Sequence, residues 1–276
     1  MMLGLAAVWS AFRGQVELAA WLIVWACFLD GLDGVLARLL NARSHFGIEF
    51  DSLADHVSFG LAPAALIASY ADNLGIGVWD GSRHSWLVLA PVTFYVVMAG
   101  VRLARYNVQT LELGEMLFRG LPTTMCAGIV SVLILTLIKH GNPVHSRDGV
   151  LIFTSVVAGG FGLLMVSNLP LPKFRKRRIR VYGMIESVLA GILIILGFMR
   201  RMPEVLLAAS CIYCIGGVFV GKRFERAYFR EQERRLNMAK EAERALTRIS
   251  EADDEIEDDE EEDEESREEG TISSIP

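Results

Sequence analysis

The feature that most limits the fold of this chain is a series of apolar runs, each close to the length of a membrane-crossing helix. The hydrocarbon core of a bilayer is about 30 Å thick, so a helix needs roughly 20 apolar residues to cross it. We therefore predict an all-α, polytopic membrane helix bundle of about eight spans, with a short first span. The predicted spans are residues 1–13, 16–40, 47–71, 86–106, 121–139, 149–169, 183–199 and 203–221.

Composition favours a membrane protein over an ordinary soluble domain. Of the 276 residues, 52% are hydrophobic, and the mean hydropathy is +0.36. The net charge of -6 is a poor guide, because residues 251–269 hold 15 acidic residues and one Arg. The rest of the chain is therefore about +8, as expected of a protein that lies against anionic lipid at one membrane face.

The acidic run also divides the chain. We predict a membrane-embedded domain over residues 1–221, a charged cytoplasmic helix over 222–249 and a disordered acidic tail over 250–276. A segment so rich in acids cannot bury enough apolar surface to fold. Two interpretations of the tail stay open, a solvated end and a site that recruits basic partners.

Basic residues predict the orientation of the bundle in the membrane. Lys and Arg gather where the even-numbered spans end, most densely at 173–180 and 222–235. The positive-inside rule places those ends in the cytoplasm, together with both chain termini. Arg200 and Arg201 go against this orientation, but the cluster at 173–180 outweighs them.

The four cysteines do not indicate a disulfide or zinc site. Cys211 and Cys214 form a C-x-x-C inside an apolar run that has no turn, no His and no partner pair. We interpret both as small hydrophobic residues of the core, along with Cys27 and Cys126.

Four aspartates stand at the facing ends of the second and third predicted spans. Asp30 and Asp33 are three residues apart, and Asp51 and Asp55 are four apart, so each pair lies on one face of a helix. The short link at 41–46 makes the two helices antiparallel neighbours, which brings the pairs together. Each charge costs about 3 kcal/mol at depth on insertion scales, and like charges repel, so we expect a cation among the aspartates.

This arrangement predicts a metal site for a phosphate substrate. Carboxylate oxygens suit Mg²⁺ or Mn²⁺, and four carboxylates allow two ions. Such ions neutralise the charge of a departing phosphate. Small side chains at Gly34 and Ala37 let a nucleotide approach the helix closely, and Arg38 offers a planar fork for phosphate oxygens.

The stretch from residue 30 to 55 fits the pattern D-x₂-D-G-x₂-A-R-x₈-G-x₃-D-x₃-D at every fixed position. With this motif the chain resembles the CDP-alcohol phosphatidyltransferases, which are integral membrane enzymes of phospholipid synthesis. The segments "FDSLADHVSFGLAPA", "RLARYN", "GLPTT" and "LMVSNLPLPKF" resemble the bacterial branch that uses serine, so the resemblance covers roughly residues 16–220. The fixed positions are Asp30, Asp33, Gly34, Ala37, Arg38, Gly47, Asp51 and Asp55.

The resemblance implies an activity and a set of roles. The implied reaction transfers the phosphatidyl group from CDP-diacylglycerol to the hydroxyl of L-serine and releases CMP. It also implies a homodimer in the bacterial inner membrane, with the active site facing the cytoplasm. By position, the metal ligands would be Asp30, Asp33, Asp51 and Asp55, the general base Asp55, and the CDP-binding residues Gly34, Ala37 and Arg38.

The acceptor alcohol depends on other residues. The carboxylate of serine needs a cationic partner, and Arg102 and Arg105 at the end of the fourth span are the candidates. Arginines at a cytoplasmic helix end also serve as ordinary membrane anchors. Arg119 is a further candidate, whereas His56 points away from its neighbour Asp55 and is expected to pack.

Three alternatives stay open. A sister enzyme of the family would use choline, inositol or a phosphorylated polyol, although "DSLADH" at 51–56 counts against a glycerol-phosphate acceptor. A cation transporter would also hold carboxylates in the membrane, but it would spread them over several spans, often with a repeat. A membrane scaffold would act through the acidic tail.

Overall fold

The computed structural model describes residues 1–40, 45–81, 83–112, 117–144, 146–167 and 169–172, and parts of 203–241. Residues 1–222 form one compact unit, and residues 223–276 form another. In the second unit residues 233–238 are helical, and the predicted acidic tail lies outside the described residues. The predicted domain boundaries therefore stay a prediction.

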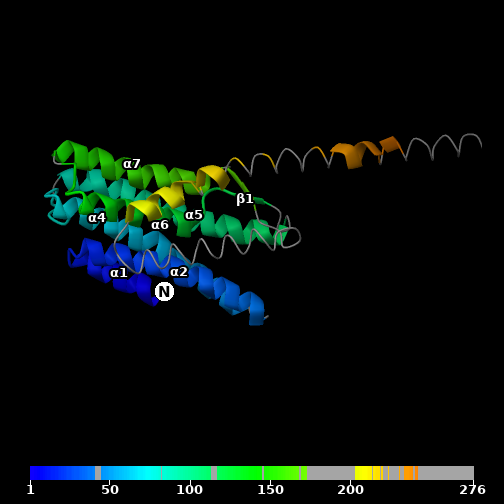
Figure 1. Ribbon diagram of the computed structural model, residues 1–276, viewed down its shortest axis with the longest axis horizontal. Coiled ribbons are helices and arrows are strands. Elements are labelled where there is room, and N and C mark those ends of the chain that lie inside the picture. Colours follow the sequence, from blue (N-terminus) through cyan, green and yellow to red (C-terminus); the bar gives the residue numbers. More distant parts are fainter. Residues whose placement is uncertain are drawn as a thin grey trace, which may run out of the picture. The chain divides into compact units, whose positions relative to one another are not determined.

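The first unit contains the helices α1 (Met2–Phe12), α2 (Val16–Leu40), α3 (His45–Asp55), α4 (Ala62–Asn73), α5 (Arg83–Glu112), α6 (Thr123–Lys139) and α7 (Arg147–Val166), the π-helix η1 (His56–Leu61) and the strands β1 (Leu117–Arg119) and β2 (Pro170–Pro172) (Figure 1).

The helices pack through small side chains. Helix α1 lies against α2, α4 and η1, while α2 packs on α6 and α5 packs on α7 (Figure 1). Small side chains let helix backbones approach closely, which favours tight packing where lipid removes the hydrophobic drive. Gly162 illustrates this, since a methyl group there would lie 3.1 Å from the Phe94 ring on α5. The buried alanines of α1, α2 and α4 include Ala7, Ala11, Ala19, Ala20, Ala62, Ala64, Ala68 and Ala71.

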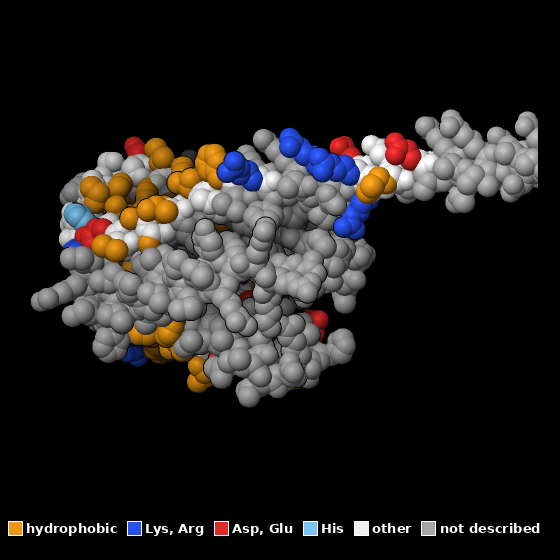
Figure 2. Space-filling model, turned by 45° about the vertical axis from the view of Figure 1, so that its right-hand side comes forward, with side chains coloured by type: hydrophobic (Ala, Val, Ile, Leu, Met, Phe, Trp, Pro, Cys, Tyr) orange, Lys and Arg blue, Asp and Glu red, His pale blue; other side chains and the backbone are white. Residues whose placement is uncertain are grey.

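Two helices in the described part of the chain are long and apolar enough to cross a membrane, His84–Val108 and Arg147–Val166. Their outward residues are hydrophobic, with Ile152, Val156 and Leu163 of α7 more than 60% exposed. Figure 2 shows hydrophobic side chains gathered at the upper left of the visible surface. Exposed apolar side chains of this kind are unfavourable in water and favourable in lipid.

The predicted spans agree with the helices that the structure describes. The runs at 121–139 and 149–169 correspond to α6 and α7, and the run at 86–106 lies inside α5. The run at 183–199 lies outside the described residues, so the number of spans stays a prediction. Within the last run, Pro203–Gly217 is an apolar helix. The cysteines are free thiols, but Cys211 is exposed rather than buried as predicted.

A π-helical turn interrupts the third predicted span directly after Asp55. Pro63 explains the interruption, because proline has no N–H for the carbonyl four residues earlier and its ring clashes with that carbonyl. The carbonyl concerned belongs to Phe59. It accepts a hydrogen bond from the buried Tyr95 hydroxyl of α5 at 3.2 Å instead. Tyr95 therefore ties the π turn to α5.

The helices agree with the predicted all-α architecture, and a short antiparallel ladder adds to it. Strand β1 pairs with β2, so that Phe118 lies opposite Leu171. Gly120 follows β1 with a φ of +85°, and a side chain there would collide with the carbonyl oxygen of Met165. Only glycine suits such a position. The ladder holds the start of α6 against the end of α7.

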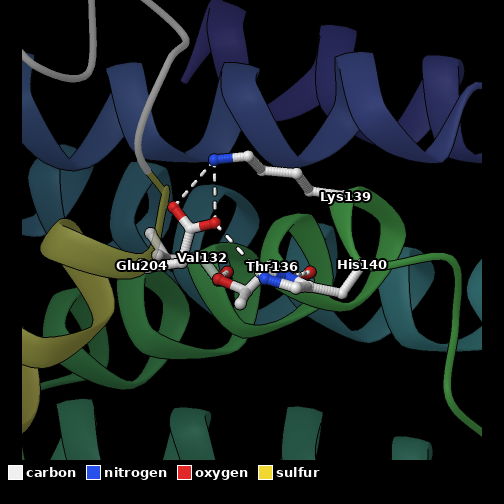
Figure 3. A network of polar contacts seen from close by, with 5 residues as sticks. All are labelled: Val132, Thr136, Lys139, His140 and Glu204. Atoms are coloured by element: carbon white, nitrogen blue, oxygen red, sulfur yellow. Dashed lines mark hydrogen bonds and ion pairs between the residues drawn. The ribbon is translucent and has the colours of Figure 1, made fainter.

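An ion pair lies at the C-terminal end of α6, and we call this end of the bundle the closed end. Glu204, in the helical segment Pro203–Gly217, lies 2.8 Å from the ammonium group of Lys139 (Figure 3). The His140 ring lies 3.7 Å from the same carboxylate and 2.9 Å from the carbonyl oxygen of Thr136. These contacts join the last described helix of the first unit to α6.

Candidate active site

Three aspartate side chains converge at one end of the bundle. Asp30 on α2 and Asp51 and Asp55 on α3 each offer a carboxylate oxygen, and these oxygens lie within 4.8 Å of one another. The two elements thus bring together residues 21 to 25 positions apart in the sequence. Three hard oxygen ligands at this spacing could hold a divalent cation.

Local structure explains the placement of each carboxylate. Asp51 and Asp55 lie one α-helical turn apart on α3, so they share a face. Asp30 lies one turn beyond Cys27 on α2. The Cys27 thiol donates to the carbonyl oxygen of Thr124 at 3.4 Å, which fixes this part of α2 against the start of α6.

The aspartates line a cavity of about 440 Å³ between α1, α2, α3 and η1. Asp33 borders the same cavity, although it does not belong to the set of three oxygens within 4.8 Å. Met1, Met2 and Leu3 form the wall contributed by the start of α1. The side chains of this wall are apolar, whereas the aspartates make the α2 and α3 part of the cavity acidic.

The predicted nucleotide residues continue the helix that carries Asp30. Gly34, Ala37 and Arg38 lie in the final turns of α2, four, seven and eight residues after Asp30. These spacings put them on the Asp30 face of the helix. Their side chains lie outside the described part of the structure.

Two arginines of α5 border the site on another side. An Nη1 nitrogen of Arg102 donates to the hydroxyl of Thr123 at 3.1 Å. The Arg102 guanidinium also lies near enough to Asp55 for the opposite charges to attract. Arg105 donates to the carbonyl oxygen of Val166 at 3.2 Å. Neither arginine borders the described cavity, whereas Asp55, which interacts with Arg102, does.

Two further residues considered from the sequence are Arg119 and His56. Arg119 ends β1, and its side chain lies outside the described part. The His56 ring packs between Gly60 and Gly100, where an added methyl group would lie 3.1 Å and 3.3 Å from ring atoms. This agrees with the expectation that His56 packs.

Sequence analysis missed three residues that shape the site. Thr123 holds Arg102, and Tyr95 holds the π turn that follows Asp55. Ser58 lines the cavity from that turn. Pro63 offered a signal for the π turn, because a proline inside an apolar helical run predicts an interruption about one turn earlier. The partner of Arg102 is 21 residues away and left no local signal.

Comparison with known proteins points to one family. The family model described as CDP-alcohol phosphatidyltransferase matches residues 1–168, which include all three converging aspartates. The CDP-diacylglycerol–serine O-phosphatidyltransferase of Helicobacter pylori J99 is 34% identical over 220 residues, covering 78% of this chain and 84% of that protein. The protein of the same name from Bacillus subtilis is 32% identical over 173 residues, covering 63% of this chain and 85% of the relative. A third, from Methanocaldococcus jannaschii, is 30% identical over 197 residues, covering 71% and 81%.

Proposed function

Because this chain belongs to the CDP-alcohol phosphatidyltransferase family, we propose that it is a phosphatidylserine synthase. It transfers the phosphatidyl group of CDP-diacylglycerol to the hydroxyl of L-serine and releases CMP. The similarity to serine-specific relatives reaches 84% of the length of the Helicobacter protein. The observation that carries the proposal is the convergence of Asp30, Asp51 and Asp55 at the positions of the family motif.

The aspartates have two tasks in this reaction. Asp30, Asp33, Asp51 and Asp55 would hold two divalent cations, Mg²⁺ or Mn²⁺. When bound, the ions supply charge neutralisation at the phosphate groups. Asp55 also accepts the proton of the serine hydroxyl, because an alcohol is a poor nucleophile at neutral pH.

The bond changes follow from these roles. The serine oxygen attacks the phosphorus atom that carries diacylglycerol, and a new phosphorus–oxygen bond forms there. The bond from that phosphorus to the bridging oxygen of the diphosphate breaks, and CMP leaves with the electron pair. The proton of serine passes to Asp55, which accepts it as the nucleophile develops.

The two substrates approach Asp55 from different sides. CDP-diacylglycerol lies along the Asp30 face of α2, where Gly34 and Ala37 leave room for the nucleotide and Arg38 binds the diphosphate. Serine lies toward α5, where Arg102 and Arg105 bind its carboxylate. The attraction between Arg102 and Asp55 supports this side for the acceptor.

Membrane placement fits the substrates. The eight predicted spans place the aspartates and both termini at the cytoplasmic face of the bacterial inner membrane. Serine and CMP reach the site from the cytosol, while the lipid chains stay in the bilayer. The apolar α5 and α7 support this placement. The resemblance to the family also implies that the chain works as a homodimer.

The test is release of CMP from CDP-diacylglycerol by the purified protein. L-Serine, glycerol-3-phosphate, myo-inositol and choline are offered in parallel with Mg²⁺ or Mn²⁺, and Asp55→Asn serves as the inactive control. We expect release with serine, and a fall of about 10²- to 10⁴-fold in the variant.

Each other result has a defined meaning. Release with a different alcohol keeps the family chemistry and assigns the chain to a sister enzyme. Equal release by the wild type and Asp55→Asn contradicts the role of Asp55. If no alcohol supports metal-dependent release, the proposed function is wrong, and ion flux in proteoliposomes then tests the transporter alternative.

A further inference from the structure

The hydroxyl of Ser58 is buried without a hydrogen-bond partner among the described residues. Ser58 is 3% exposed, and its Oγ has no donor or acceptor within reach. Other buried hydroxyls do have partners, since Ser131 and Thr154 donate to the carbonyls of Ala127 and Val150 at 2.8 Å. An unpaired buried polar group is costly, so it requires an explanation.

Ser58 lies between helix α1 and the cavity. Helix α1 closes one side, because a methyl group at Gly4 would lie 2.5 Å from Ser58 Oγ and 2.7 Å from its Cα. Ser58 also lines the cavity that contains Asp30 and Asp55. Ser58 therefore shares the cavity wall with the aspartates, three residues after Asp55 in the chain.

The chemistry of the cavity identifies the type of ligand. The aspartate oxygens accept hydrogen bonds when ionised, whereas a serine hydroxyl can also donate one. Phosphate oxygens are acceptors that carry negative charge, and hydrogen bonds to charged groups are the stronger ones. Among the described side chains that line the cavity, Ser58 supplies a neutral donor for such an oxygen.

The position of Ser58 favours one of the two substrates. The cavity lies between α1, α2 and α3, on the side of α2, and the α5 arginines do not border it. On the proposed function, which this inference rests on, that side receives CDP-diacylglycerol. We propose that Ser58 binds the donor substrate, with its Oγ donating a hydrogen bond to a phosphate oxygen of CDP-diacylglycerol.

The other unpaired buried atom offers a contrast. Nδ1 of His56 also has no partner, but its ring faces Gly60 and Gly100. His56 does not line the described cavity. Only the Ser58 hydroxyl combines an unmet hydrogen bond with a position on the cavity wall, among the described residues.

The experiment compares Ser58→Ala with Ser131→Ala, a buried serine whose hydroxyl already bonds within its own helix. Steady-state CMP release gives separate KM values for CDP-diacylglycerol and serine, and thermal unfolding is measured without substrate. For Ser58→Ala we expect the KM for CDP-diacylglycerol to rise about tenfold, since a hydrogen bond to a charged group is lost. The KM for serine and the unfolding midpoint should stay the same, because the free protein loses no contact.

Several results would overturn the inference. One is an unchanged KM for CDP-diacylglycerol in Ser58→Ala, and another is an equal rise in Ser131→Ala. A rise in the KM for serine alone would assign the hydroxyl to the acceptor. Unfolding of Ser58→Ala would show a structural partner in the free protein. A wild type that releases no CMP with any alcohol would instead refute the proposed function, so the two failures are distinct.

Discussion

Charged side chains are arranged differently near the two ends of α6. Near its start, Asp30, Asp51 and Asp55 bring together carboxylates of the same sign. Near its other end, about 25 Å away along the helix axis, the Glu204 carboxylate lies against the ammonium group of Lys139 (Figure 3). One end gathers charges that need a ligand, whereas the other pairs its charges within the chain.

Hydrogen bonds follow the same division. The closed end ties its turns to one another, since Asn73 donates to the carbonyl oxygen of Gly14 at 2.8 Å and the carboxylate of Asp72 accepts from the Val78 N–H at 2.8 Å. At the aspartate end the Ser58 hydroxyl has no partner. The difference teaches that an unmet polar group at one place in a bundle is informative when most other buried polar groups in the described part are satisfied.

The largest effect should come from removing divalent metal. A chelator should abolish CMP release, and Mg²⁺ or Mn²⁺ in excess should restore it. The unfolding midpoint should also fall on chelation, because a ligand present at 100 times its Kd adds about 2.7 kcal/mol of stability. Calorimetry and the release assay measure both effects. Full turnover in the presence of the chelator would show that the aspartate end needs no metal ion, which would contradict the contrast between the two ends.

Substitution of one carboxylate at each end tests the contrast directly. Asp30→Asn should lower CMP release by at least about 100-fold and weaken Mn²⁺ binding, since loss of an indirect ligand contact alone costs 10- to 100-fold. Asp72→Asn should leave turnover and Mn²⁺ affinity unchanged. It should destabilise the protein by about 1 kcal/mol through the weaker bond to Val78. Similar losses of Mn²⁺ affinity in both variants would contradict the assignment.

Two tyrosine hydroxyls offer a smaller test. Tyr95→Phe removes the hydrogen bond to the buried Phe59 carbonyl, so we expect a loss of about 1 kcal/mol and a lower rate, because the π turn follows Asp55. Tyr70→Phe removes a longer bond of 3.3 Å to Asn142, which is partly exposed. It should cost less and leave the rate unchanged. Unfolding curves in detergent and initial rates check both. Equal rates for the two variants would show that the π turn does not position Asp55.

The smallest effect should come from the ion pair at the closed end. Glu204→Gln removes an exposed pair with Lys139, and exposed pairs contribute little and are screened by salt. CMP release should be unchanged, and the unfolding midpoint should barely move. A marked loss of turnover would mean that the two ends are coupled.

Sequence periodicity predicted the helices, but not every contact between them. The runs that became α6 and α7 were correct within a few residues, because an apolar run of this length has one stable form in a membrane. The ladder of β1 and β2 was not predicted, since three residues that include Pro170 and Pro172 carry no strand periodicity.

The spacing of the aspartates predicted which of them share a helix face. It could not give the distances across helices, which depend on how α2 meets α3. Asp33 illustrates the limit, because it lines the cavity but stands outside the group of three oxygens. The hydrogen bond of Arg102 to Thr123 likewise depends on the packing of α5 against the start of α6.

The π turn at His56–Leu61 determines where this helix can gain or lose a residue. A residue added to a helix rotates everything before it by about 100° relative to everything after it. Asp51 and Asp55 therefore face the cavity, and the alanines of α4 face the core, in a combination that an unbroken helix of the same sequence would not allow. The π turn takes up such an extra residue, so removing one residue from it would restore an ordinary α-helical turn and leave the aspartates and the alanines on their present faces. This helix should therefore keep its geometry best when a deletion falls within the π turn, and lose it when a deletion falls on either side.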